Sequence, residues 1–123
     1  MSHVQAWMPV ISELAVEPGC RSLTCRLLVR HDMPVLRGHF PAMPMVPGVV
    51  MVGWATELAR AHGLATGRFA GIITAKFQRI VRPGMHLEAR LEQGARPGQL
   101  QFRYEFRDTV VSTGRLQFGA GGD

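Results

Sequence analysis

The hydrophobic and polar positions divide the chain into an extended first part, one helical segment and a longer extended second part. Residues 22 to 30 (SLTCRLLVR) combine alternation with a short apolar run, which is typical of a strand with one well-buried end. Residues 32 to 47 contain four prolines, which exclude a regular helix or a continuous β-ladder. We therefore expect a strand followed by a constrained loop.

The segment after this loop, residues 48 to 62 (GVVMVGWATELARAH), contains no proline and is followed by Gly63, a residue that favours a helix C-terminus. Its apolar residues recur at helical spacing but also occupy positions off that stripe. The pattern predicts a single helix that is buried on several sides.

The rest of the chain divides into four extended pieces, at residues 69–81, 85–93, 99–108 and 109–118. Two of the breaks are turn sequences, Arg82-Pro83-Gly84 and Arg96-Pro97-Gly98. Leucine, alanine and aromatic residues alternate with polar ones in the second and third pieces, as in antiparallel strands with one buried face. The pattern predicts a meander of antiparallel strands after the helix.

An early strand or strand pair, one buried helix and then a run of antiparallel strands define an α+β protein. This order predicts a hotdog fold, in which an antiparallel β-sheet is wrapped around one central helix. The length of 123 residues and the apolar content of 46% suit one domain. We expect a single domain over residues 1–123, with residues 118–123 as a flexible tail.

The formal charge of +5 suits an acidic partner, but the basic residues form no block and no RNA-binding aromatic signature occurs, so nucleic acid is not expected. No apolar run is long enough to cross a membrane, and the first residues do not resemble an export signal. The two cysteines, Cys20 and Cys25, are too few for a disulfide framework, and the histidines have no metal-ligand spacing. We expect a cytoplasmic protein without a metal site.

The segment RGHFPAMPMVPG, residues 37 to 48, carries the clearest chemical signal. Prolines fix its path, and it places His39 shortly before the start of the predicted helix. The first N–H groups of a helix can polarise a carbonyl oxygen, and a neutral imidazole can remove a proton next to that carbonyl. This combination favours enolate-type chemistry, with His39 as the base and the Gly48 N–H as a donor to the oxyanion.

The spacing of Gly38-His39-Phe40-Pro41, Pro44 and Pro47-Gly48-Val49 resembles the signature of the bacterial 3-hydroxyacyl-carrier-protein dehydratases, enzymes of fatty-acid or polyketide-type biosynthesis. Trp54, the Ala-Thr-Glu-Leu-Ala run at 55–59 and Lys76-Phe77 are similar to the subgroup of aryl-polyene dehydratases. The resemblance covers roughly residues 20 to 118.

The resemblance implies a hotdog dimer with active sites between the subunits, as a homodimer or a higher oligomer of dimers. It implies no cofactor of the enzyme's own. The substrate would be a thioester carried on the phosphopantetheine of an acidic acyl carrier protein, or on coenzyme A. Phe40 and Trp54 are candidates for an apolar wall around the acyl group, with plain core packing as the alternative for each, and Pro47, Val49 and Gly53 are further candidate substrate contacts.

The sequence departs from this family at Gly53. The related dehydratases have a carboxylate fourteen residues after the motif histidine, contributed by the partner subunit as a proton donor, and this chain has a glycine there. Glu57 lies one helical turn further on and is the candidate substitute acid; the alternative is a structural glutamate that pairs with Arg60 or Lys76. Gly53 also leaves room for an acyl chain to pass close to the helix backbone.

Three functions remain open at this point. The first is a dehydratase in which His39 removes the C2 proton and Glu57 or a water protonates the C3 hydroxyl. The second is an acyl thioesterase that uses Glu57. The third is a non-catalytic carrier-binding protein, or one subunit of a heterodimer that lacks the usual acid because of Gly53.

Overall fold

The computed structural model describes residues 7–19, 21–33 and 45–119 of the chain. The strands and the helix, in chain order, are β1 (Val10–Val16), β2 (Ser22–Leu28), α1 (Gly48–Ala61), β3 (Phe69–Phe77), β4 (His86–Gln93), β5 (Gln99–Phe106) and β6 (Thr109–Phe118). The predicted helix and the four later strands are therefore present, and the third extended piece ends at Phe106 because residues 107 and 108 form the turn into β6.

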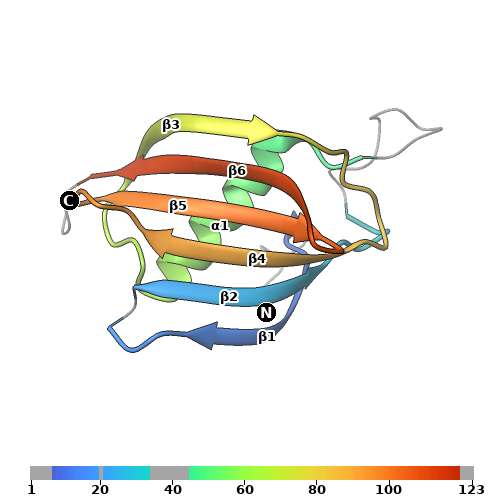
Figure 1. Cartoon of the computed structure of the whole chain (residues 1–123), viewed down its shortest axis with the longest axis horizontal. Helices are drawn as coiled ribbons and strands as arrows, with labels where there is room; N and C mark the ends of the chain where they lie inside the picture. The colour runs from blue at the N-terminus through green and yellow to red at the C-terminus, as the bar shows by residue number, and fades with distance from the viewer. Residues whose placement is uncertain (1–6, 20, 34–44, 120–123) are drawn as a thin grey trace.

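All six strands form one antiparallel sheet in the order β1-β2-β4-β5-β6-β3. Helix α1 lies against one face of this sheet and crosses behind its central strands (Figure 1). The chain leaves the helix to form β3 at one edge, and β1 forms the other edge. This arrangement is the predicted hotdog fold.

The core lies between the helix and the inner face of the sheet. Its centre is the fully buried ring of Trp54 on α1, which makes an edge-to-face contact with Tyr104 of β5, with 6.4 Å between the ring centroids. The Tyr104 hydroxyl donates a hydrogen bond of 2.7 Å to the carbonyl oxygen of Met51. A polar group of the sheet therefore holds the first half of the helix in place.

Buried and exposed side chains alternate along the middle strands, as the sequence predicts. Along β4 the side chains at 87, 89 and 91 are buried and those at 86, 88 and 90 are exposed, because successive side chains of a strand point to opposite faces. The inner face packs on the helix, and the outer face carries charged and polar side chains. Among the described residues, the helix covers one face of this sheet.

The early strand or strand pair expected from the sequence is a pair, β1 and β2. Strand β1 is exposed along its length and interrupted by a bulge at Glu13, whose φ is 53°, so its pattern is irregular. One sequence prediction needs correction. Phe118 does not belong to a flexible tail, because it ends β6 with 1% exposure and its ring contacts that of Phe69. Residues 120–123 lie outside the described residues. In the described part of the chain, no helix is long and apolar enough to cross a membrane.

Candidate functional site

The start of helix α1 is the first component of the candidate site. Pro47 precedes the helix with φ of −62° and ψ of 147°, and its carbonyl oxygen accepts the Val50 N–H at 3.0 Å. The approach to the helix is fixed on the sheet side, where the Val46 N–H donates to the Val81 carbonyl oxygen at 2.8 Å. No acidic residue lies in the first turn, so no carboxylate there offsets the partial positive charge of the helix N-terminus.

Phe77, the last residue of β3, packs against this helix start. A Cβ atom built on Gly48 would lie 2.9 Å from Cζ of the Phe77 ring and 3.0 Å from each neighbouring ring carbon. Real side chains do not approach this closely, so residue 48 has to be glycine while the ring stays where it is. The glycine predicted as an oxyanion donor is thus also the contact point between the helix and β3.

A depression of about 220 Å³ opens beside this contact. Its residues, which come from the loop before the helix, the first helical turn and the end of β3 with the segment after it, are Met45, Val46, Pro47, Gly48, Met51, Phe77, Gln78, Arg79 and Ile80. Most of this lining is apolar. An apolar depression that contains a helix N-terminus suits a ligand with one polar acceptor, such as a carbonyl oxygen, on an apolar group.

The structure describes only some of the other residues that the motif predicts for the site. His39 and Phe40 lie outside the described residues, so the predicted base and its neighbour have no described position. Pro47 lines the depression together with Gly48. Val49 is 72% exposed and does not line the depression, so its predicted contact with substrate stays a prediction.

The space expected above Gly53 is occupied by Trp7, from the segment before β1. A Cβ atom on Gly53 would lie 3.0 Å from Cζ3 and 3.3 Å from Cη2 of the Trp7 indole. The expectation that the missing side chain leaves a passage is therefore corrected for the single chain. Sequence reasoning missed Trp7 because it is 46 positions away and nothing in its local pattern indicates the contact.

Trp54 also makes its contacts inside the chain. It is fully buried, and its Nε1–H donates a hydrogen bond of 2.8 Å to the carbonyl oxygen of Trp7. Trp54 is not among the residues that line the depression at the helix start. Its predicted contact with an acyl group stays a prediction, and the structure assigns it a core position that also anchors the Trp7 segment.

Glu57 is exposed on the side of α1 that also carries Val49 and Gly53. Within the described residues it makes no ion pair, so the alternative pairing with Arg60 or Lys76 is absent. Glu57 follows Gly48 by nine residues, which corresponds to about 13 Å along the helix axis. Glu57 and the Gly48 N–H of one chain are therefore too far apart to act on neighbouring atoms of one substrate.

Strand β3 exposes apolar side chains at the edge of the sheet. Phe69, Ile72, Ile73 and Phe77 are 41%, 49%, 44% and 46% exposed. A strand at a sheet edge also has backbone groups without a neighbouring strand, which favours pairing with another chain. The edge that carries Phe77 is thus suited to a subunit interface next to the helix start.

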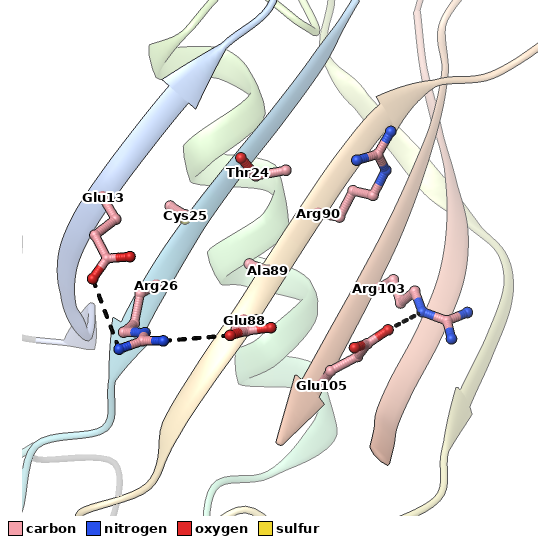
Figure 2. Close-up of a pocket in the computed structure, with 9 residues that line it drawn as sticks. All are labelled: Glu13, Thr24, Cys25, Arg26, Glu88, Ala89, Arg90, Arg103 and Glu105. Atoms are coloured by element: carbon pink, nitrogen blue, oxygen red, sulfur yellow. Dashed lines mark hydrogen bonds and ion pairs between the residues drawn. The ribbon is translucent and has the colours of Figure 1, made fainter. Parts of the chain in front are cut away.

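Among the described residues, the outer face of the sheet also forms depressions that are lined mostly by polar and charged side chains. One, of about 350 Å³, contains Arg26 between Glu13 and Glu88, with ion pairs of 3.7 and 3.4 Å, and also the pair Arg103 and Glu105 (Figure 2). Its three arginines and three glutamates balance one another. This balance gives no preference for a charged ligand.

The second outer depression, of about 680 Å³, has an excess of positive charge, from Lys76, Arg90, Arg103 and Arg115 against Glu92. Lys76 thus lines a depression on the outer face, whereas Arg79 lines the depression at the helix start. Of these two cations, Arg79 is the one beside Gly48.

The sheet around one helix and the motif loop leading into that helix define the class as a hotdog-fold dehydratase. Residues 16–115 match the family model of the ApeI-like dehydratases (ApeI dehydratase). The chain belongs to this family.

Individual relatives agree with this assignment. The chain is 34% identical to the 3-hydroxyacyl-(acyl-carrier-protein) dehydratase FabZ of Chloroflexus aggregans over 94% of this chain and 87% of that protein. It is 33% identical to FabZ of Rickettsia bellii, over 93% of this chain and 81% of that protein. Among solved structures, the dehydratase heterocomplex ApeI:P from Xenorhabdus doucetiae is similar with a TM-score of 0.80 and 27% identity, covering 89% of this chain and 96% of that chain.

Proposed function

We propose that the protein is a dehydratase of 3-hydroxyacyl thioesters, which eliminates water across C2 and C3 to give the 2-enoyl thioester. The main supporting observation is that Gly48, the first residue of helix α1, lines an apolar depression. In the sequence, Gly48 directly follows the loop with the dehydratase motif. Family membership supports the reaction class, and the relatives named for carrier-protein substrates support a carrier-bound substrate.

In the proposed reaction, the Gly48 N–H donates to the thioester carbonyl oxygen and His39 takes the proton from C2. The negative charge that develops on the oxygen is stabilised by the helix N-terminus. The C3–O bond then breaks, the C2–C3 double bond forms, and the hydroxyl leaves as water after receiving a proton. The electron pair of the C2–H bond becomes the new double bond, so no oxidant or reductant takes part.

The proton for the leaving hydroxyl is proposed to come from Glu57 of a second subunit. The separation of about 13 Å along the helix excludes Glu57 of the same chain from a substrate held at Gly48. The exposed position of Glu57 and the apolar edge at β3 support a site completed by another copy of the chain. A homodimer is accordingly part of this proposal.

The test follows the absorbance of the enoyl thioester formed from 3-hydroxybutanoyl thioesters of coenzyme A and of an acyl carrier protein. We expect His39→Ala and Glu57→Gln each to lower kcat at least a hundredfold. The matched controls are His86→Ala and Glu17→Gln, two exposed residues away from the helix start, and both should retain wild-type rates. Full activity of His39→Ala would refute the proposal.

The two-subunit arrangement is tested by mixing the His39→Ala and Glu57→Gln proteins under conditions that allow subunit exchange. Half of the dimers would then be mixed, and each mixed dimer would have one intact site of two, so about a quarter of wild-type activity should return. If each site were formed within one chain, no activity would return. Size measurements on the mixture check that exchange has taken place.

A second candidate is a subunit of a heterodimer that has no activity alone. Gly53 and the similarity to a structure described as a dehydratase heterocomplex favour it. In that case the purified chain would give no turnover, and activity would appear on mixing with a second hotdog subunit that carries the acid. Hydrolysis of the thioester, the remaining alternative, would release a free thiol, which the same assay detects with a thiol reagent.

A further inference from the structure

We propose that Phe77 selects the acyl group by excluding thioesters that carry a substituent on C2, the carbon next to the carbonyl. This inference rests on the proposed function, because it takes the Gly48 end of helix α1 as the position that binds the carbonyl oxygen. It assigns a role to a residue that the proposed reaction itself does not use.

The inference rests on the position of the Phe77 ring. The three outer carbons of the Phe77 ring surround the place where a Cβ of Gly48 would be, at 2.9 to 3.0 Å. Phe77 and Gly48 both line the depression at the helix start, together with Met51. The ring is therefore part of the wall nearest to the N–H group that is proposed to hold the carbonyl oxygen.

In a thioester bound in this way, C2 would lie beside this wall. A carbonyl oxygen that accepts the Gly48 N–H lies about 2.9 Å from that nitrogen, and C2 is only two bonds from the oxygen. An unsubstituted CH₂ fits at the ordinary distance of about 3.5 to 4.0 Å between carbon atoms. A methyl group on C2 that points toward β3 would have to occupy the space of the ring.

The backbone around Phe77 is fixed, so the ring cannot withdraw by a shift of the chain. Phe77 pairs with Ser112 of β6 at the end of the strand. The N–H groups of Gln78 and Arg79 both donate to the carbonyl oxygen of Val111, at 2.8 and 3.2 Å. Rotation of the side chain toward the exposed edge is the remaining movement, and a subunit packed on β3 would block it.

The experiment compares two coenzyme A thioesters, 3-hydroxybutanoyl and 2-methyl-3-hydroxybutanoyl, with the wild-type protein and Phe77→Ala. We expect the wild-type protein to prefer the unbranched thioester. Phe77→Ala should raise the ratio of kcat/KM for the branched over the unbranched thioester about tenfold or more, which is the usual effect of one methyl group in a close-fitting site. An unchanged ratio would overturn the proposal.

Phe69→Ala is the matched control, because it removes the same ring from the same strand. Phe69 is 41% exposed against 46% for Phe77, and it packs on Phe118 with 5.7 Å between ring centroids. If removing a ring only disturbed the packing of the β3 edge, the kcat/KM ratio of the two thioesters would change equally in both variants. We expect this ratio to change only in Phe77→Ala. An equal change in both would contradict the proposal.

Binding measurements with unreactive thioether analogues of the same two acyl groups distinguish a failure of the proposed function from a failure of the proposed role of Phe77. If the wild-type protein converts neither thioester, the proposed function fails, and the ratio of the two dissociation constants then tests Phe77. In Phe77→Ala the dissociation constant of the branched analogue should fall relative to that of the unbranched one. If the ratio is unchanged, Phe77 is not the selecting residue. Phe77→Leu, which keeps an apolar side chain, replaces the alanine variant if that variant does not fold.

Discussion

The indole of Trp7 lies over Gly53 of helix α1, with Cζ3 3.0 Å from the place of a Cβ atom, and the Trp7 carbonyl oxygen accepts the Nε1–H of Trp54 at 2.8 Å. The segment before β1 is therefore attached to the helix by one packing contact and one hydrogen bond. A side chain at position 53 would crowd a tryptophan far away in the sequence, which favours glycine there in addition to any role in the site.

This contact predicts that substitutions at positions 7 and 53 are coupled. Gly53→Ala should gain about 1 kcal/mol of stability from helix propensity when Trp7 is replaced by alanine. With Trp7 present the gain should be smaller or reversed, because the new methyl group meets the indole. Urea unfolding of the wild type, both single variants and the double variant measures a coupling that we expect to exceed about 0.5 kcal/mol. Equal effects of Gly53→Ala in both backgrounds would disprove the contact.

Tyr104→Phe should destabilise the protein by about 1 kcal/mol or somewhat more. The ring is kept, but the Met51 carbonyl oxygen loses a hydrogen bond of 2.7 Å in the core. Thermal and urea unfolding measure the loss. Ser112→Ala is a useful comparison, since its buried hydroxyl donates a long hydrogen bond of 4.0 Å to the Met51 Sδ atom, and the loss of this weaker bond should cost less. The reverse order of the two effects would contradict this account.

A charge in the middle of β3 should disrupt the proposed homodimer. Ile72 is 49% exposed on this edge strand, and a glutamate there would repel an approaching copy and be costly to bury. We expect Ile72→Glu to remain folded but to elute as a monomer, as measured by size-exclusion chromatography with light scattering. Ile11→Glu on β1, the opposite edge, should leave the oligomer intact. Loss of the oligomer only in Ile11→Glu would place the interface at β1 instead.

The Cys25 thiol should be slow to react in the folded protein. Burial raises its pKa to about 11 from 9.0, so at pH 8 only about one thiol in a thousand is a thiolate. A Cys20→Ser variant isolates this thiol, and a disulfide reagent should modify it slowly in buffer and rapidly in denaturant. Because the raised pKa keeps the folded thiol protonated, this group's contribution to stability should be lost as the pH rises from about 9 to 11. Rapid modification without denaturant would show that Cys25 is accessible.

The sequence predicted the helix closely, because the run of prolines that ends at Pro47 disfavours a helix before it and Gly63 follows its end. It predicted β4 and β5 well, since one face of each packs on the helix and the other faces water. The extended piece predicted at 69–81 ends earlier, at Phe77, and β3 shows no alternation of buried and exposed residues because it lies at the sheet edge. The motif around His39 was also visible, because its prolines and glycines have fixed spacing. The bounds of strand β1 could not be predicted, since an exposed edge strand with a bulge has no regular alternation.

The sequence by itself determined the fold class, the position of the helix start and the reaction class implied by the motif, because each depends on local spacing. Only the tertiary structure decided which distant side chains meet these features. Phe77 reaches Gly48 because β3 lies beside the helix start, and Trp7 reaches Gly53 because the first segment folds back over the helix. These contacts depend on how separate elements pack, and the period of hydrophobic residues within one element contains no information about its neighbour's side chains.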